Sequence, residues 1–260
     1  MNYDIIIQAG QSNAEGYGFG PVEKEYEVND KILHMNALKS VVSHEPYITI
    51  TYEDKPFEII PADYRENENG KIGDFSLSFS SRFVEEGMLD EDRKLLIIRA
   101  GVGSTGFVRG NWGKCAQLGL KMLEMIDYAL SLGEDCRLVA FLWHQGETDA
   151  ARGCIPEVYR MQIENMVNLV RSRYNAYDLP FIAGDFVHHW KNMNLKICEP
   201  IISKLNEALD NLGNSAFVKT DGLLSNNQKI GNKDVIHFCR QSLHELGERY
   251  FEAYKDIIKA

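Results

Sequence analysis

Residues 4–16 read Asp-Ile-Ile-Ile-Gln-Ala-Gly-Gln-Ser-Asn-Ala-Glu-Gly, and this stretch decides the fold prediction. The run at 4–8 is apolar and β-branched, which predicts a short buried strand that Gly10 ends. Ser12 follows this strand directly, so its hydroxyl could project into a crevice and its N–H could point at a bound carbonyl. A helix cap or a turn is an equally good interpretation of this spacing, because Ser and Asn favour both.

The rest of the chain alternates apolar runs with amphipathic segments. Strands are expected at 94–99, 138–143, 179–183 and 216–219, and helices at 74–88, 114–132, 156–174, 196–212 and 240–258. Strands this uniformly apolar are usually covered on both faces, as in a parallel sheet. The sequence therefore predicts an α/β fold, a doubly wound three-layer α/β/α sandwich with a mostly parallel sheet, as a single domain over residues 1–260.

Residues 31–72 fit this alternation poorly. They hold short strand-like pieces at 32–35 and 47–52, interrupted by turn-forming residues. We expect this region to be an irregular insertion beside the core.

The composition narrows the function. Among 260 residues the net charge is −10 and Lys and Arg form no cluster, which argues against a nucleic-acid partner. No run approaches the ~20 apolar residues of a membrane span, and the apolar run at 5–7 is too short for a signal peptide. Five scattered cysteines without a CxxC pair predict reduced thiols in a cytoplasmic protein.

Polar groups follow the other strands. Asp234 and His237 precede the last helix, and a histidine beside a carboxylate is the arrangement that activates a serine. After the strand at 138–143, Gln145 could donate to an oxyanion and Glu147 could orient a histidine. The alternatives are a surface loop for the first pair and a helix-capping cluster for the second.

Residues 101–106 read Gly-Val-Gly-Ser-Thr-Gly, which matches the G-x-G-x-x-G pattern of dinucleotide sites. The match does not follow the first strand, and Gly110 and Gly113 prevent a helix from starting at its third glycine. The nearest suitable acid, Glu124, falls inside a predicted helix. We therefore expect no nucleotide cofactor, and the Gly103 N–H is instead a candidate oxyanion donor. The histidines lack ligand spacing, so no metal is expected.

Taken in order, four motifs resemble the SGNH hydrolase superfamily, and more closely its sialate O-acetylesterase and acetylxylan esterase branch. The matching segments are 10–13 (Gly-Gln-Ser-Asn), 101–105 (Gly-Val-Gly-Ser-Thr), 144–147 (His-Gln-Gly-Glu) and 234–238 (Asp-Val-Ile-His-Phe). The resemblance implies a flavodoxin-like fold and a serine esterase that removes acetyl groups from a sugar or oligosaccharide through an acyl-serine. A hydrolase of lipid-like acyl esters or thioesters and a non-catalytic carbohydrate-binding relative are the alternatives.

The resemblance also implies roles for individual residues. Ser12 would be the nucleophile, His237 the base, and the oxyanion donors would be the N–H groups of Ser12 and Gly103 and the Gln145 side chain. Either Asp234 or Glu147 would orient His237, with Asp234 slightly favoured. Gln11 and Trp112 are candidates to bind substrate, although Trp112 could equally be a core residue. The branch more often has Gly where Ser104 stands, so this side chain could narrow the pocket.

Overall fold

The computed structural model describes residues 1–44, 47–68 and 70–259. The strands are β1 (Asn2–Gly10), β2 (Ile32–Asn36), β3 (Lys39–His44), β4 (Tyr47–Tyr52), β5 (Glu58–Pro61), β6 (Arg65–Asn67), β7 (Gly70–Ile72), β8 (Arg93–Arg99), β9 (Arg137–His144), β10 (Phe181–Gly184) and β11 (Ser215–Val218). The helices are α1 (Ser12–Glu15), α2 (Phe75–Glu85), α3 (Gln117–Ser131), α4 (Glu147–Ala151), α5 (Pro156–Arg173), α6 (His188–Met193), α7 (Leu195–Leu212), α8 (Asn226–Ile230) and α9 (Arg240–Lys259).

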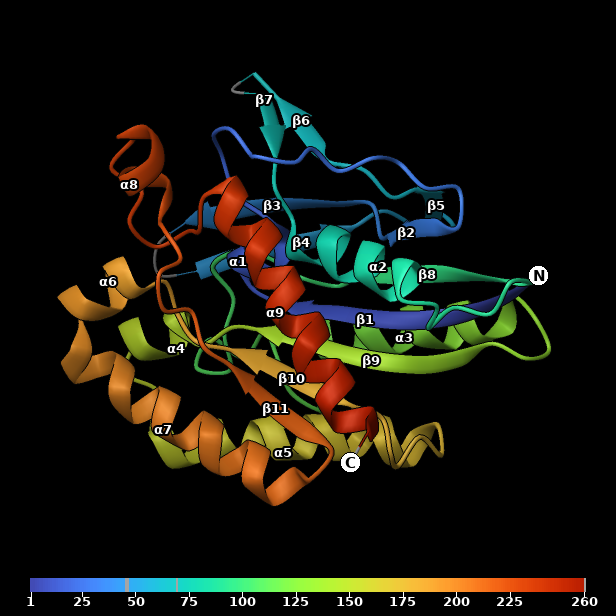
Figure 1. Ribbon diagram of the computed structural model, residues 1–260. Helices are drawn as coiled ribbons and strands as arrows, with labels where there is room; N and C mark the ends of the chain where they lie inside the picture. Colours follow the sequence, from blue (N-terminus) through green and yellow to red (C-terminus); the bar gives the residue numbers. More distant parts are fainter. Residues whose placement is uncertain (45–46, 69, 260) are drawn as a thin grey trace.

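One central sheet organises the molecule (Figure 1). Its seven strands lie in the order β11-β10-β9-β1-β8-β2-β5, and every neighbouring pair is parallel except β2 with β5. The apolar run of β1 lies in the middle of the sheet, where Ile5, Ile6 and Ile7 are completely buried. This arrangement confirms the predicted mostly parallel sheet.

The two faces of the sheet carry different helices. Ile5 and Ile7 of β1 face a core built with α3, α5 and α7, while Ile6 faces a core built with α2 and α9. Figure 1 shows α2 and α9 side by side over one face. Successive side chains of a strand point to opposite faces, so a strand covered on both must be apolar throughout. The three-layer α/β/α fold is therefore confirmed.

The strand-like pieces predicted at 32–35 and 47–52 are strands β2 and β4, but the prediction that residues 31–72 lie beside the core is wrong for β2 and β5. β2 joins the central sheet parallel to β8, and β5 closes that edge antiparallel to β2. Ile32 and Met35 of β2 are fully buried, although these strands of five and four residues are too short to show a clear period. The pairs β3–β4 and β6–β7 form two small sheets of their own.

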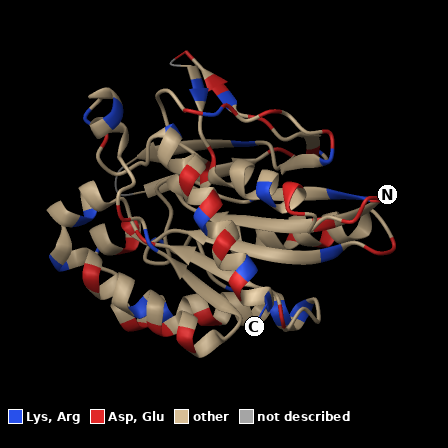
Figure 2. Cartoon of the chain, viewed as in Figure 1, with Lys and Arg blue, Asp and Glu red and all other residues tan. Residues whose placement is uncertain are grey.

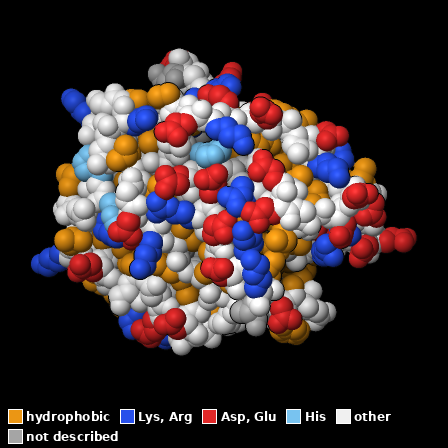
Figure 3. Space-filling view, in the orientation of Figure 1, with side chains coloured by type: hydrophobic (Ala, Val, Ile, Leu, Met, Phe, Trp, Pro, Cys, Tyr) orange, Lys and Arg blue, Asp and Glu red, His pale blue; other side chains and the backbone are white. Residues whose placement is uncertain are grey.

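The outer surface mixes charges of both signs. Figure 2 shows acidic and basic residues interspersed along the helices, including α9, and Figure 3 shows their side chains next to one another on the face viewed. In the part of the chain that the structure describes, no helix is long and apolar enough to cross a membrane.

The carboxyl ends of β1, β8 and β9 lie together, because β1 pairs with β8 on one side and β9 on the other. The strand order therefore reverses at β1, and open α/β sheets bind ligands at the carboxyl ends of the strands beside such a reversal. Gly10 at the end of β1 pairs with His144, and the Gln11 N–H donates to the His144 carbonyl at 3.0 Å. These bonds bring Ser12, which starts α1, beside the loop after β9.

Gly10 permits this approach because it has φ +133° and a Cβ there would lie 2.2 Å from the His144 carbonyl oxygen. Gly10→Ala should lower the free energy of unfolding by about 3 kcal/mol, since positive φ costs about 1–2 kcal/mol and overpacking about 1–3 kcal/mol. Gly213→Ala is the matched control, because Gly213 has φ +59° with no atom within 4 Å of its Cβ position. Equal losses in urea denaturation would show that the His144 contact is unimportant.

Candidate active site

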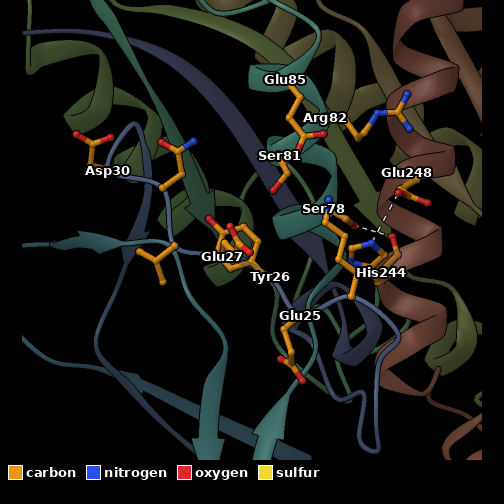
Figure 4. Close-up of a pocket in the computed structure, with 13 residues that line it drawn as sticks. Glu25, Tyr26, Glu27, Asp30, Ser78, Ser81, Arg82, Glu85, His244 and Glu248 are labelled. Carbon is orange, nitrogen blue, oxygen red and sulfur yellow. Dashed lines mark hydrogen bonds and ion pairs between the residues drawn. The ribbon is translucent and has the colours of Figure 1, made fainter.

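Ser12 and His237 line one cavity of about 280 Å³, although 225 positions of sequence separate them. Its other lining residues come from the end of α1, the loop after β8 and the β3–β4 hairpin, and they are Glu15, Tyr17, Val41, Ser43, Ile48, Gly103 and Ser104. A larger cavity of about 450 Å³ lies between the 24–30 segment, α2 and α9 (Figure 4). Neither Ser12 nor His237 lines that cavity.

Asp234 holds the His237 ring. Its Oδ2 lies 2.8 Å from His237 Nδ1, and its Oδ1 accepts the backbone N–H of His237 at 3.2 Å. The buried Asn226 donates to the same carboxylate at 2.9 Å. Burial raises the pKa of Asp234, but its bond to His237 and the charge of that ring outweigh burial and hold the pKa below its ordinary value. Asp234 is therefore an ionised carboxylate that orients the imidazole.

Tyr17 supports the ring from another side. Its ring stacks on His237 with centroids 5.2 Å apart and an interplanar angle of 24°. The Arg65 guanidinium lies 5.6 Å from the Tyr17 ring centroid. Burial, followed by the negative charge of Glu15, raises the pKa of Tyr17, so its hydroxyl stays protonated. The sequence analysis missed Tyr17, although it follows the nucleophile motif by only a few residues.

Glu147 contacts Asn13 and does not hold the His237 ring. Asn13 Nδ2 donates to Glu147 Oε1 at 2.8 Å and to the Ile236 carbonyl at 3.1 Å. Asn13 Oδ1 in turn accepts the Phe238 N–H at 3.2 Å. Burial raises the pKa of Glu147. Of the two acids that the sequence left open, the structure thus places Asp234 against the imidazole and Glu147 behind Asn13.

The side chains of Gln11 and Gln145 belong to the framework behind the cavity, and both are at most 2% exposed. Gln145 Nε2 donates to the Asp149 carboxylate and lies 3.3 Å from both Gln11 Oε1 and the Thr105 carbonyl. Gln11 Oε1 also accepts the Thr148 N–H at 3.1 Å. Gln11 does not line the cavity that Ser12 and His237 share, so this geometry does not support its predicted contact with substrate. The amide hydrogens of Gln145 are likewise directed at these partners rather than at the cavity.

Trp112 is a core residue. It is 3% exposed, and its indole N–H donates to Thr105 Oγ1 at 2.9 Å. Its ring meets Trp143 edge to face, with centroids 5.0 Å apart. Trp112 lines a separate cavity of about 1040 Å³ and not the one that Ser12 and His237 share, so this geometry does not support its substrate-binding alternative.

The loop after β8 does not form a dinucleotide site, because the next helix, α3, begins only at Gln117. The Gly103 N–H donates to Glu15 Oε2 at 2.7 Å. Ser104 has φ 60°, a left-handed conformation that favours glycine, which is the residue that the resembling branch more often carries there. Ser104 also lines the cavity, as the sequence analysis anticipated.

Two further features concern metal ligands and cysteine thiols. Among the described residues, no group of three or more His, Cys, Asp or Glu side chains is arranged to hold a metal ion. The thiols of all five cysteines are free.

Comparison with known proteins agrees with this geometry. A family model described as carbohydrate esterase, sialic acid-specific acetylesterase matches residues 2–256. Among curated proteins, no sequence matches significantly.

Solved structures share the fold at low sequence identity. A crystal structure of NanS aligns with a TM-score of 0.77 and 18% identity over 99% of this chain and 98% of that chain. A protein from Arabidopsis thaliana aligns with a TM-score of 0.69 and 19% identity over 98% of each chain. A carbohydrate acetylesterase from Xanthomonas citri aligns with a TM-score of 0.65 and 17% identity, over 98% of this chain and 56% of that chain.

At these identities the structural matches show the fold, while the family match spans nearly the whole chain. The chain therefore belongs to the carbohydrate esterase family of sialic acid-specific acetylesterases, a family of carboxylic ester hydrolases.

Proposed function

We propose that this esterase removes acetyl groups from a carbohydrate through an acyl-serine formed on Ser12, with His237 as the base and Asp234 as its orienting acid. The observation that carries the proposal is the cavity that Ser12 shares with His237, whose Nδ1 lies 2.8 Å from Asp234. A carboxylate at Nδ1 favours the tautomer whose Nε2 can accept the serine proton.

The proposed reaction has two steps. His237 Nε2 takes the Ser12 proton as Oγ attacks the acetyl carbonyl, and the C–O bond to the sugar breaks as His237 returns the proton to the departing alcohol. A water, deprotonated by the same imidazole, then attacks the acyl-serine and releases acetate. Ser12 is the first residue of α1, so its N–H has no acceptor within the helix and can donate to the oxyanion. The Gly103 N–H is the second donor, and each such donor contributes roughly 10²–10³ in rate.

The cavity supports a small acyl group. Its volume of about 280 Å³ suits an acetyl ester better than a long acyl chain, and Glu15, Tyr17 and Ser43 offer polar groups to adjoining hydroxyls. An acetylated sugar or oligosaccharide is therefore the proposed substrate, in agreement with the family. The cytoplasmic location and the lack of a nucleic-acid partner remain predictions, supported by the free thiols and the net charge of −10.

Ser12→Ala should lower kcat for p-nitrophenyl acetate, and for acetate release from acetylated xylan or O-acetylated sialic acid, by at least about 10³-fold. Ser43→Ala is the matched control, because Ser43 lines the same cavity from β3 and is expected to change kcat less than about fivefold. A Ser12→Ala protein that keeps a tenth of the activity would rule out Ser12 as the nucleophile.

Asp234→Asn should reduce kcat by about 10²–10⁴-fold, because the amide no longer stabilises the imidazolium that forms on His237. Glu147→Gln should cost less than about tenfold, since a Gln oxygen can still accept from Asn13. Steady-state kinetics of the two variants tests the assignment, and the opposite order of losses would give the orienting role to Glu147.

Glu147→Gln should also change how stability depends on pH. Burial raises the folded-state pKa of Glu147, so the folded protein binds this proton more tightly than the unfolded chain. Its contribution to stability is present at low pH and is lost as pH rises from the ordinary value of 4.5 through the raised pKa. Urea denaturation from pH 5 to pH 8 should find the variant more stable at pH 8, with the difference shrinking toward pH 5. A variant less stable at pH 8 would contradict this.

A further inference from the structure

The carboxylate of Glu15 covers an N–H that the proposed reaction needs. Glu15 Oε2 accepts the Gly103 N–H at 2.7 Å. A Cβ built on Gly103 would lie 3.4 Å from that oxygen and 3.5 Å from Ser12 Cβ, so the carboxylate and the nucleophile flank Gly103 together. Glu15 also lines the cavity with Ser12 and His237.

This arrangement conflicts with the stabilisation of an oxyanion. The Gly103 N–H carries one proton, and a bond to Glu15 leaves no donor for a second acceptor. A carboxylate at this position would also repel the negative charge that develops on the acetyl carbonyl oxygen. The Gly103 donor therefore works only when the Glu15 carboxylate has moved away.

The backbone of Glu15 is fixed, so this movement involves the side chain alone. The Glu15 carbonyl accepts from Arg65 Nη2 at 3.0 Å and from Arg99 Nη2 at 2.7 Å, and its N–H donates to the Gln11 carbonyl at 2.8 Å. Gly101 packs tightly behind it, since a Cβ there would lie 2.8 Å from the Glu15 nitrogen.

A space bordered by cationic side chains adjoins the Glu15 side chain. Lys39 Nζ lies 3.6 Å from Glu15 Oε1, the oxygen not bonded to Gly103. Glu15 and Lys39 also line a second, small cavity of about 100 Å³ together with Arg65 and Arg99. A carboxylate that rotates away from Gly103 can therefore enter a space bordered by three cationic side chains.

We propose that Glu15 is a side-chain gate on the Gly103 oxyanion donor, and that Lys39 holds the gate open while the acyl carbonyl is bound. This inference rests on the proposed function, because it assigns the Gly103 N–H to the oxyanion. Glu15 and Lys39 are positioning residues here, since they act on the reaction through Gly103.

The test is a double-mutant cycle that measures kcat/KM for p-nitrophenyl acetate. Glu15→Ala removes the competing carboxylate and should raise kcat/KM roughly tenfold, the effect of one charge-assisted hydrogen bond. Lys39→Ala should lower kcat/KM at least about threefold when Glu15 is present and leave it unchanged in the Glu15→Ala protein. Glu53→Ala is the control, because Glu53 is an exposed acid that directly follows β4 and pairs with Lys55.

Each result is compared at equal amounts of folded protein, determined by thermal unfolding and by titration of the active serine with a fluorophosphonate. Glu15→Gln, which keeps the side-chain shape, provides a second test if Glu15→Ala does not fold, and it should also raise kcat/KM. An active wild-type protein with unchanged or lower kcat/KM in the Glu15 variants would overturn the gate. A Lys39→Ala effect that is equal in both backgrounds would overturn the role of Lys39. Failure of the wild-type protein to react with the fluorophosphonate would instead overturn the proposed function.

Discussion

The carboxamide of Asn13 joins the three loops on which the site depends. It donates to Glu147 after β9 and to the Ile236 carbonyl, and it accepts from the Phe238 N–H, so it clamps the backbone on both sides of His237. Asn13 is completely buried, where water does not compete for these bonds and each of them is costly to break. Because Asn13 follows Ser12 in α1, the same clamp fixes Ser12 and His237 around the cavity that they share.

Much of the fold follows from sequence because the strands are buried on both faces. The run 5–7 predicted a buried strand, and its three isoleucines are completely buried in the middle of the sheet. The helix predicted at 74–88 is α2, which Asp74 caps by accepting the Ser76 N–H at 2.8 Å. Short elements gave no such signal. β5 and α1 have four residues each, so neither periodicity nor length separates them from loops. The strand-like piece predicted at 32–35 is β2, but its five residues did not show that it joins the central sheet.

The sequence could predict which residues lie at the site when their position is set by the ends of strands. It could not predict contacts that depend on the side chains of other segments. The sequence placed Ser12, His237 and Asp234 in one site, and the structure brings Ser12 and His237 to one cavity with Asp234 against the His237 ring. Their catalytic roles stay predictions. Sequence cannot show that Gln145 donates a hydrogen bond to Asp149 or that Trp112 is buried. Both facts depend on how distant segments of the chain pack together. Asn13, Glu15 and Tyr17 were within the quoted motif or next to it, but only the fold shows which groups they contact.

The central claim is that His237 activates Ser12 as a nucleophile, and covalent labelling with a fluorophosphonate tests it most directly. Mass spectrometry of the labelled and digested protein should find one adduct per chain, on the peptide that carries Ser12. His237→Ala should form that adduct at least about 10²-fold more slowly, the usual contribution of a general base. An adduct on another residue, no adduct at all, or an equal labelling rate without the imidazole would contradict the account.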